Sequence, residues 1–375
     1  MAALPQPIFT YDSLGIDPKT KNIQRVPVFE NFTTIFTRLG LLGKGGFGSV
    51  FLAKNNRSGE LMAAKFIELS VRNTIDQILK SMSEVEMLRA INAKNKTVPP
   101  EKRIDIPEYY GSFLVRKPDL PGGLKDYDFV VMMEYIDGED MDKVYKSWVK
   151  MFDPENPDHD KRLLQNIFNL SRWFYRTLAN LHDIDVVHRD IKPVNIMKRN
   201  FDPENPNQSQ FVLLDLGLTC RLPQSKLQKA PIEAGSRHDL ERFNIETACR
   251  ISKAGTVKYL APEIFIGMQD LEGYKATDVW AAGVTFWELS NLKPFDHNTF
   301  KMLDFLYYIE VGIFPTIYMP PFDRVISESL NVIISKRPSA REIYIFIENF
   351  LKGDFAATIQ FGYSKKLLVS GTNIV

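Results

Sequence analysis

The chain has 375 residues, of which 44% are hydrophobic and 25% are charged, and its net charge at pH 7 is +1. These values are typical of a soluble globular protein and provide no basic field that would attract nucleic acid, so no nucleic-acid partner is expected. No stretch approaches the ~20 apolar residues that cross a bilayer, and residues 1–10 lack the pattern of a secretory signal. The sequence therefore predicts a cytoplasmic or nuclear protein without a membrane span.

The two cysteines, Cys220 and Cys249, are separated by a polar stretch. Two cysteines do not form a disulfide framework, and no Cys/His cluster has the spacing of zinc ligands. We therefore expect two free thiols in a reducing compartment.

The first third of the chain has the pattern of a small sheet with one helix. Residues 1–36 contain several prolines without periodicity and are expected to form an extension. Apolar residues at helical spacing predict a helix over 74–91. Strand-like runs lie at 38–42, 49–53, 61–67 and 129–133.

Past Gly138 the pattern turns helical, with apolar stripes over 163–181, 278–290 and 339–351. A strand-rich first third followed by a helix-rich remainder predicts an α+β architecture with two lobes. Polar loops are expected at 93–106, 116–127, 152–161 and 201–209.

Three constellations carry chemistry, and the first is glycine-rich: Gly43, Gly45, Gly46, Phe47 and Gly48. Such a loop lets backbone N–H groups approach phosphate oxygens. Here it lies between two strands, whereas the dinucleotide-binding fingerprint opens a helix. Lys65 follows within the next strand, where it needs an anionic partner. Glu84 shares a helix face with apolar residues and is preferred over Glu86, which points about 200° away.

The second constellation is His-Arg-Asp-Ile-Lys-Pro-Val-Asn at 188–195, and the third is Asp-Leu-Gly at 215–217. Asp190 supplies a carboxylate near a nucleophilic hydroxyl, and Asn195 supplies a neutral oxygen ligand for a hard cation. Asp215 follows an apolar strand and offers a second metal-binding carboxylate.

In this order, and together with Ala-Pro-Glu at 261–263, the Asp278–Gly283 motif and Arg337, these motifs resemble the eukaryotic-type protein kinase superfamily over residues 37–352. The resemblance implies a bilobal kinase fold, with a small antiparallel β-sheet lobe plus one helix, a larger mainly helical lobe, and ATP in the cleft between them. It divides the chain into an extension (1–36), an N-lobe (37–138), a C-lobe (139–352) and a tail (353–375).

The resemblance also implies residue roles. Lys65 would hold the α- and β-phosphates and pair with Glu84, Asp190 would accept the proton of the substrate hydroxyl, and Lys192 would steady the γ-phosphate. Asn195 and Asp215 would bind Mg²⁺, or Mn²⁺ in its place. Glu263 would pair with Arg337, Asp278 would brace the catalytic loop, and His188 would join an apolar stack with Leu216 and Leu88. The expected adenine and ribose contacts are Val50, Ala63, Met133, Glu134, Ile136, Asp140 and Met197.

Serine/threonine specificity rests on Lys192 and Thr256, which match positions typical of serine/threonine kinases. Val194 stands where many kinases that select basic targets have an acidic residue, so no preference for arginine upstream of the target is expected. Leu216 stands where the family usually has phenylalanine. The long segment 215–261 and Arg189 suggest control by phosphorylation, by an upstream kinase or by the chain itself. The hydroxyl residues of this segment include Thr219, Ser225, Ser236, Thr247 and Ser252.

The sequence thus predicts an active protein kinase that uses Mg-ATP and docks protein substrates on its C-lobe. The alternatives are a kinase-fold scaffold without phosphoryl transfer and a kinase of small molecules. The intact Lys65, Asp190, Asn195 and Asp215 weigh against a scaffold. The peptide-docking motifs around Glu263 and Asp278 weigh against a small-molecule kinase.

Overall fold

The computed structural model describes residues 28–29, 32–45, 48–69, 75–116, 127–151, 157–200, 209–227, 247–250, 254–267, 271, 273–291 and 322–353. The chain divides into two compact units. The first unit comprises Met1–Val98, Ile106–Asp137 and Leu227–Ala248, and the second comprises Pro99–Asp105, Gly138–Lys226 and Cys249–Val375.

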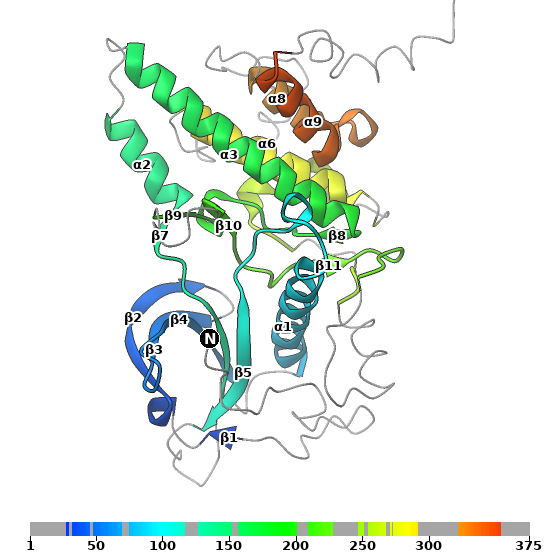
Figure 1. The fold of residues 1–375 in the computed structure, drawn as a ribbon. Helices are drawn as coiled ribbons and strands as arrows, with labels where there is room; N and C mark the ends of the chain where they lie inside the picture. Colours follow the sequence, from blue (N-terminus) through cyan, green and yellow to red (C-terminus); the bar gives the residue numbers. More distant parts are fainter. Residues whose placement is uncertain are drawn as a thin grey trace, which may run out of the picture. The chain divides into compact units, whose positions relative to one another are not determined.

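The first unit is built on a six-stranded sheet in the order β1-β5-β6-β4-β3-β2, antiparallel except where β1 pairs with β5 (Figure 1). A short 3-10 helix, η1 (Phe32–Thr34), precedes β2. The strands are β1 (Val28–Phe29), β2 (Phe36–Gly45), β3 (Gly48–Asn55), β4 (Leu61–Leu69), β5 (Tyr109–Arg116) and β6 (Tyr127–Glu134).

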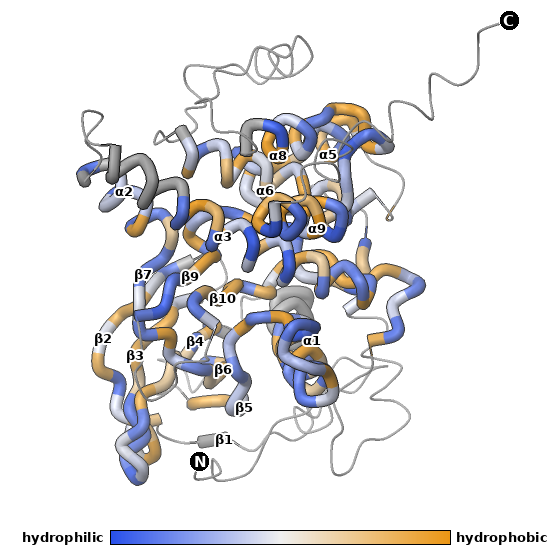
Figure 2. The backbone as a smooth tube through the Cα atoms, turned by 45° about the horizontal axis from the view of Figure 1, so that its top comes forward, coloured by the Kyte–Doolittle hydropathy of each residue, from blue (hydrophilic) through white to orange (hydrophobic). Residues whose placement is uncertain are grey.

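Helix α1 (Ile75–Asn95) lies beside β5 in this unit (Figure 1). Orange and blue stretches alternate along it in Figure 2, as expected for a helix with one apolar side. Its buried residues include Val85, Leu88 and Ile91. Side chains of the sheet strands and of η1 form another buried apolar cluster in this unit. It contains Phe32, Phe36, Ala53, Met62, Ala64, Phe113, Val115, Val130 and Met132.

The second unit is mainly helical. Helix α3 contacts α6 and α9, and α6 contacts α8. At Gly283 of α6 an added Cβ would meet Ser329 and Leu330 at 2.8–2.9 Å, so the absence of a side chain lets α8 approach closely. The helices are α2 (Met141–Met151), α3 (Pro157–Asp183), α5 (Pro262–Ile266), α6 (Tyr274–Asn291), α8 (Phe322–Ser329) and α9 (Ala340–Leu351).

Short strands in the second unit flank the segments 188–195 and 215–217, and a 3-10 helix ends the first of these segments. One small sheet has the order β10-β9-β7 and another pairs β11 with β8. The strands are β7 (Gly138–Asp140), β8 (Val186–Val187), β9 (Ile196–Arg199), β10 (Phe211–Leu213) and β11 (Cys220–Arg221). The 3-10 helices are η2 (Pro100–Lys102), η3 (Pro193–Asn195), η4 (Val257–Tyr259) and η5 (Ile334–Lys336).

The α+β class is confirmed, with an antiparallel sheet plus helix in one unit and a mainly helical second unit. The domain boundaries at 37, 139 and 353 stay predictions. The polar loops 116–127 and 201–209 lie largely outside the described residues, as do most of the extension and the tail. Of the polar loop expected at 152–161, residues 152–156 also lie outside them, and for residues 157–161 the expectation is wrong, because α3 begins at Pro157. None of the helices in the described ranges is both long and apolar enough to cross a bilayer.

The expectation of two free thiols is wrong: Cys220 and Cys249 form a disulfide, with their Cα atoms 4.9 Å apart. The cysteines are 29 residues apart in sequence, so no local pattern indicates the pairing. In the fold the Cys249 N–H donates to the carbonyl oxygen of Arg221, at 2.8 Å. Arg221 follows Cys220 in the chain, so this bond holds the two cysteines side by side.

Candidate active site

The ion pair predicted for Lys65 is present in the first unit. Its Nζ lies 2.7 and 2.8 Å from the two carboxylate oxygens of Glu84, and both side chains are about nine-tenths buried. Glu86, the rejected alternative, instead accepts from Arg89 at 3.0 Å. The pair fixes the Lys65 ammonium in place, because a buried charge is retained only with a charged partner.

Lys65→Met is expected to lower the phosphoryl-transfer rate by about 10²- to 10³-fold, since it removes one preorganised positive charge. Steady-state kinetics with Mg-ATP measure the change. Arg89→Met is the matched control, because it also breaks a buried ion pair of α1 but leaves Lys65 and Glu84 in contact. We expect the control to lose stability yet keep its activity. Equal loss of activity in both variants would contradict a specific role for Lys65.

The glycine-rich segment forms the hairpin between β2 and β3. Gly43 pairs with Val50, and Gly45 pairs with Gly48 across the turn. Gly48 has φ 136°, and an added Cβ there would collide with the carbonyl oxygen of Phe66. Only glycine fits this position without strain. The predicted Gly46 and Phe47 lie outside the described residues.

Residues expected to contact adenine lie on adjoining strands of the first sheet. Val50 of β3 pairs with Lys65 of β4, and Ala63 of β4 pairs with Met133 of β6. Glu134 ends β6, and Ile136, two residues on, is buried. The sheet register therefore places Val50, Ala63 and Met133 on three successive strands.

Asp140 and Met197 belong to the second unit, where they pair in register between β7 and β9. Asp140 also has a structural role that the sequence analysis did not foresee. Its carboxylate accepts from the N–H of Lys143 at 3.0 Å and so caps the N-terminus of α2. A contact between Asp140 and ribose stays a prediction.

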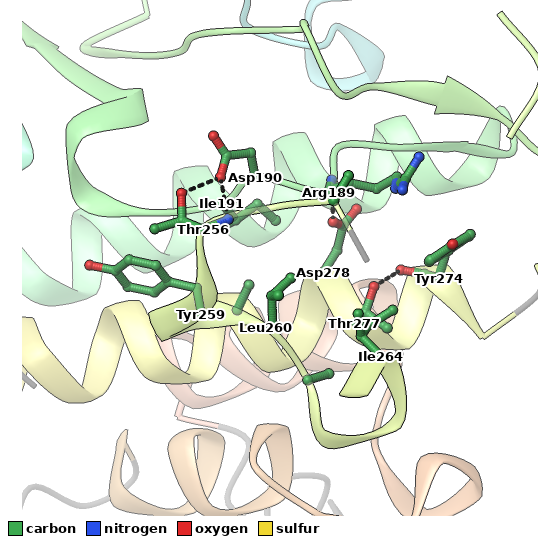
Figure 3. Close-up of a pocket in the computed structure, with 13 residues that line it drawn as sticks. Arg189, Asp190, Ile191, Thr256, Tyr259, Leu260, Ile264, Tyr274, Thr277 and Asp278 are labelled. Carbon is green, nitrogen blue, oxygen red and sulfur yellow. Dashed lines mark hydrogen bonds between the residues drawn. The ribbon is translucent and has the colours of Figure 1, made fainter. Parts of the chain in front are cut away.

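The catalytic-loop residues converge around Asp190, which is mostly buried (Figure 3). Lys192 Nζ donates to Asp190 Oδ2 at 2.7 Å and to the Thr256 hydroxyl oxygen at 2.8 Å. The Thr256 hydroxyl donates to Asp190 Oδ1 at 2.7 Å. Gly255, just before Thr256, has φ 133°, and an added Cβ would crowd Leu260 and the carbonyl oxygen of Arg189. The sequence 255–256 thus allows the close approach that the cluster requires.

The ionisation of Asp190 is set by these neighbours. Burial acts to raise its pKa, but the hydrogen bonds from Lys192 and Thr256, with the Lys192 charge, outweigh burial and hold the pKa below its usual value. Asp190 is therefore a carboxylate at neutral pH, a state in which it can orient a hydroxyl group and accept its proton.

Asn195 and Asp215 are brought together through backbone contacts. The N–H of Leu214 donates to the carbonyl oxygen of Asn195 at 2.8 Å, which places Asp215 just beyond. The Asn195 side-chain amide donates to the Asp190 carbonyl oxygen at 2.8 Å, so Oδ1 is the side-chain atom suited to a cation. Two oxygen donors fit Mg²⁺, which is commonly bound by one or two protein groups with phosphates and water. The described residues contain no cluster of three or more His, Cys, Asp or Glu side chains that could hold a metal.

Asp278 of α6 holds the backbone of the catalytic loop from below (Figure 3). Its Oδ2 accepts from the His188 N–H at 2.8 Å and lies 2.9 Å from His182 Nε2, while Oδ1 accepts from the Arg189 N–H at 2.8 Å. Arg189 has φ 69°, a conformation that is unfavourable for a residue with a side chain. The buried carboxylate therefore stabilises a backbone turn directly before Asp190, as predicted.

Asp278→Asn is expected to destabilise the chain by about 2–3 kcal/mol, because one buried N–H then faces an amide donor instead of a carboxylate. Thermal unfolding measures the loss. Thr277→Val is the control, since among the described residues the Thr277 hydroxyl donates to the Tyr274 carbonyl oxygen of its own helix alone, at 2.9 Å, and its loss should cost ~1 kcal/mol or less. Equal melting temperatures for the two variants would contradict this bracing role.

A pocket lies beside Asp190 in the second unit (Figure 3). The catalytic loop, the stretch 254–264 and α6 supply its walls. Its lining includes Asp190, Thr256, Tyr259, Leu260, Asp278 and Ala281. Tyr259 donates its hydroxyl to Glu288 at 2.8 Å, and burial, followed by the nearby Glu288 charge, raises its pKa far above the usual value. Tyr259 is therefore a neutral hydrogen-bond donor at every physiological pH.

Asp105 is a structural centre that the sequence analysis missed, because 93–106 reads as a polar loop. Its Oδ2 accepts from Trp173 Nε1 at 2.7 Å, from Arg176 at 2.8 Å and from the Ser209 hydroxyl at 3.0 Å. Its carbonyl oxygen accepts from the N–H of Leu213 at 2.8 Å. Asp105 thus ties α3 to β10, the strand that leads to Asp215, and only the fold reveals this convergence.

The hydroxyl groups proposed as phosphorylation sites differ in their surroundings. Thr219 and Thr247 are buried, and the Ser225 hydroxyl donates to the Ile184 carbonyl oxygen at 2.6 Å. These three are therefore poor phosphate acceptors in this conformation. Ser236 and Ser252 lie outside the described residues.

Comparison with known proteins agrees with this geometry. The family model described as "Protein kinase domain" matches residues 36–345. The chain belongs to the protein kinase family. The match spans the Lys65–Glu84 pair, the cluster around Asp190 and the Arg337–Glu263 pair.

The chain is similar to several curated kinases. It is 30% identical to inhibitor of nuclear factor kappa-B kinase subunit alpha of Xenopus laevis, over 68% of this chain and 28% of that protein. It is 25% identical to serine/threonine-protein kinase 4 homolog B of Dictyostelium discoideum, over 85% of this chain and 24% of that protein. It is 26% identical to calcium-dependent protein kinase 4 of Plasmodium berghei, over 80% of this chain and 46% of that protein. The chain thus spans only a quarter to a half of these relatives.

Proposed function

We propose that this chain is an active protein serine/threonine kinase that transfers the γ-phosphate of Mg-ATP to hydroxyl groups of protein substrates. The observation that carries the proposal is the Asp190–Lys192–Thr256 cluster, which combines an ionised carboxylate, a cation and a threonine within 2.7–2.8 Å of one another.

In the proposed reaction Asp190 orients the substrate hydroxyl and accepts its proton, and Lys192 steadies the γ-phosphate. Lys65 holds the α- and β-phosphates, and its ion pair with Glu84 fixes the position of its ammonium group. Asn195 and Asp215 would hold Mg²⁺, and the bound cation would offset the negative charge of the phosphates. Such a protein kinase turns over about 1–100 times per second when fully active.

Specificity for serine and threonine is proposed from Lys192 and Thr256, which both bond Asp190 and match positions typical of serine/threonine kinases. The serine/threonine kinases among the relatives are consistent with it. Protein substrates are proposed to dock on the second unit beside the pocket lined by Thr256, Tyr259 and Leu260. Control by phosphorylation of the segment 215–261 and a cytoplasmic or nuclear location also stay predictions.

The test is transfer of labelled phosphate from Mg-ATP to a mixed peptide library, followed by identification of the labelled amino acids. Label on serine and threonine alone is the expected result. Label on tyrosine would overturn the specificity. Persistent absence of label, after treatment with an activating kinase, would favour a scaffold that binds partners without phosphoryl transfer.

A further inference from the structure

The disulfide lies directly beside the catalytic loop. Cys220 pairs with Val187 in the two-stranded sheet, one residue before His188. Both cysteines are buried, with exposed fractions of 5% and 7%. The N–H of Cys249 donates to Arg221, so a backbone contact independent of the sulfurs holds the two cysteines together. The same contact would keep the thiols close after reduction.

The two sulfurs have different electrostatic surroundings. Arg189 Nη1 lies 3.7 Å from Cys220 Sγ, and the guanidinium group also lies over the ring of Tyr274, 4.7 Å from its centre. Burial lowers the pKa of Arg189, but an arginine side chain stays protonated at neutral pH. In the described part of the chain no cation lies within hydrogen-bonding distance of the Cys249 sulfur. Because a positive charge favours a neighbouring thiolate, we expect Cys220 to react faster than Cys249 in the reduced protein.

We propose that Cys220 and Cys249 form a reversible oxidation site for small peroxides, in which Cys220 reacts first and Cys249 completes the disulfide. The proposal is independent of kinase activity, because it concerns the sulfurs alone. Both sulfurs are buried, so the oxidant that reaches them has to be small, as hydrogen peroxide is.

The chemistry requires one peroxide per disulfide. The Cys220 thiolate attacks one oxygen of hydrogen peroxide, the O–O bond breaks, and the leaving hydroxide takes up a proton to become water. The product is a sulfenic acid on Cys220. The Cys249 sulfur then attacks the Cys220 sulfur, the S–S bond forms, and the Cys249 proton leaves with the hydroxyl group as a second water. The two sulfurs lose two electrons, which the peroxide gains, and a dithiol reductant restores both thiols.

The first experiment uses the full chain, reduced with dithiothreitol and freed of reductant. Hydrogen peroxide is added with dimedone, which traps sulfenic acids, and the adducts are located by mass spectrometry. Wild-type protein should re-form the disulfide. Cys249→Ser should accumulate the adduct on Cys220, whereas Cys220→Ser should label Cys249 at least about tenfold more slowly.

The role of Arg189 has its own matched pair of variants. In the Cys249→Ser background, Arg189→Gln should slow labelling of Cys220 about three- to tenfold, because the charge that favours the thiolate is lost. Arg189→Lys keeps a cation and should retain most of the rate. Limited alkylation of reduced wild-type protein needs no variant and should modify Cys220 before Cys249.

Three results would overturn the proposal: equal labelling of the two cysteines, a disulfide that dithiothreitol cannot reduce in the folded chain, or thiols that persist in excess peroxide. Because mass spectrometry reads the sulfurs directly, these results are distinct from a failure of phosphate transfer.

Discussion

Asp190→Asn is expected to lower the rate of phosphoryl transfer by about 10²- to 10⁴-fold, the range typical of a lost general base. The amide cannot accept the hydroxyl proton. It also replaces one of the two oxygens that bond Lys192 and Thr256 with a donor. Because asparagine has the size of aspartate, the fold should be kept. Single-turnover kinetics with labelled ATP measure the loss, and circular dichroism checks the fold.

The control for this variant is Asp185→Asn. Asp185 also forms an ion pair with a lysine, Lys275, in the second unit, and its φ of 55° suits asparagine. It bonds neither Lys192 nor Thr256 in the structure, so its loss should leave transfer within about twofold. A rate for Asp190→Asn within the same twofold range would contradict the assignment.

The pH dependence of transfer follows from the lowered pKa of Asp190. Burial acts to raise this pKa, but Lys192 and Thr256 lower it below the usual value of an aspartate. The ionised, active form is therefore present at all pH values above the folded pKa and is lost only as the pH falls through it. A profile of kcat/KM should show no inflection from Asp190 between pH 5 and pH 8.

Arg337→Met is expected to destabilise the chain by about 3–5 kcal/mol, the largest stability effect that we predict. The guanidinium group is fully buried, donates to Glu263 at 2.7 and 3.3 Å, and also bonds the carbonyl oxygens of Ala276 and Asn331. It further lies 5.0 Å from the ring of Trp280. Its removal leaves the Glu263 carboxylate buried without this cation. Chemical denaturation measures the loss.

Two variants separate this effect from a general loss of charge. Arg341→Met removes a cation that bonds Asp183 and Asn180 near the surface, and it should cost about 1 kcal/mol or less. Adding Glu263→Gln to Arg337→Met should recover part of the stability, because the stranded charge is gone. If Arg337→Met and Arg341→Met were equally stable, the buried pair would not be the support that the structure indicates.

The strongly periodic elements could be predicted from sequence because their signals are local. The runs at 49–53 and 61–67 lie within β3 and β4, and the helix predicted over 74–91 matches α1 except for its first residue. Strand β5 and helix α2 were not assigned. The first lies between polar loops without clear alternation, and the second is short and begins only where Asp140 caps it.

Within the site, pairs that belong to a recognisable motif set could be predicted, such as Lys65 with Glu84 and Glu263 with Arg337. Contacts between segments without a motif could not. The Cys220–Cys249 bond joins residues 29 apart in sequence, and it depends on the pairing of β11 with β8 and on the backbone contact between Arg221 and Cys249. Asp105 likewise gains its partners only when α3 and the segment that leads into β10 meet it.

The most direct test of the central claim is a comparison of γ-phosphate transfer from Mg-ATP to serine and threonine peptides by wild-type protein and by Asp190→Asn, each at the same concentration and with the fold verified. We predict label from the wild type and at least about a 100-fold lower rate from the variant. Equal rates in two folded proteins, whether both active or both silent after activation, would contradict the claim that Asp190 performs phosphoryl transfer.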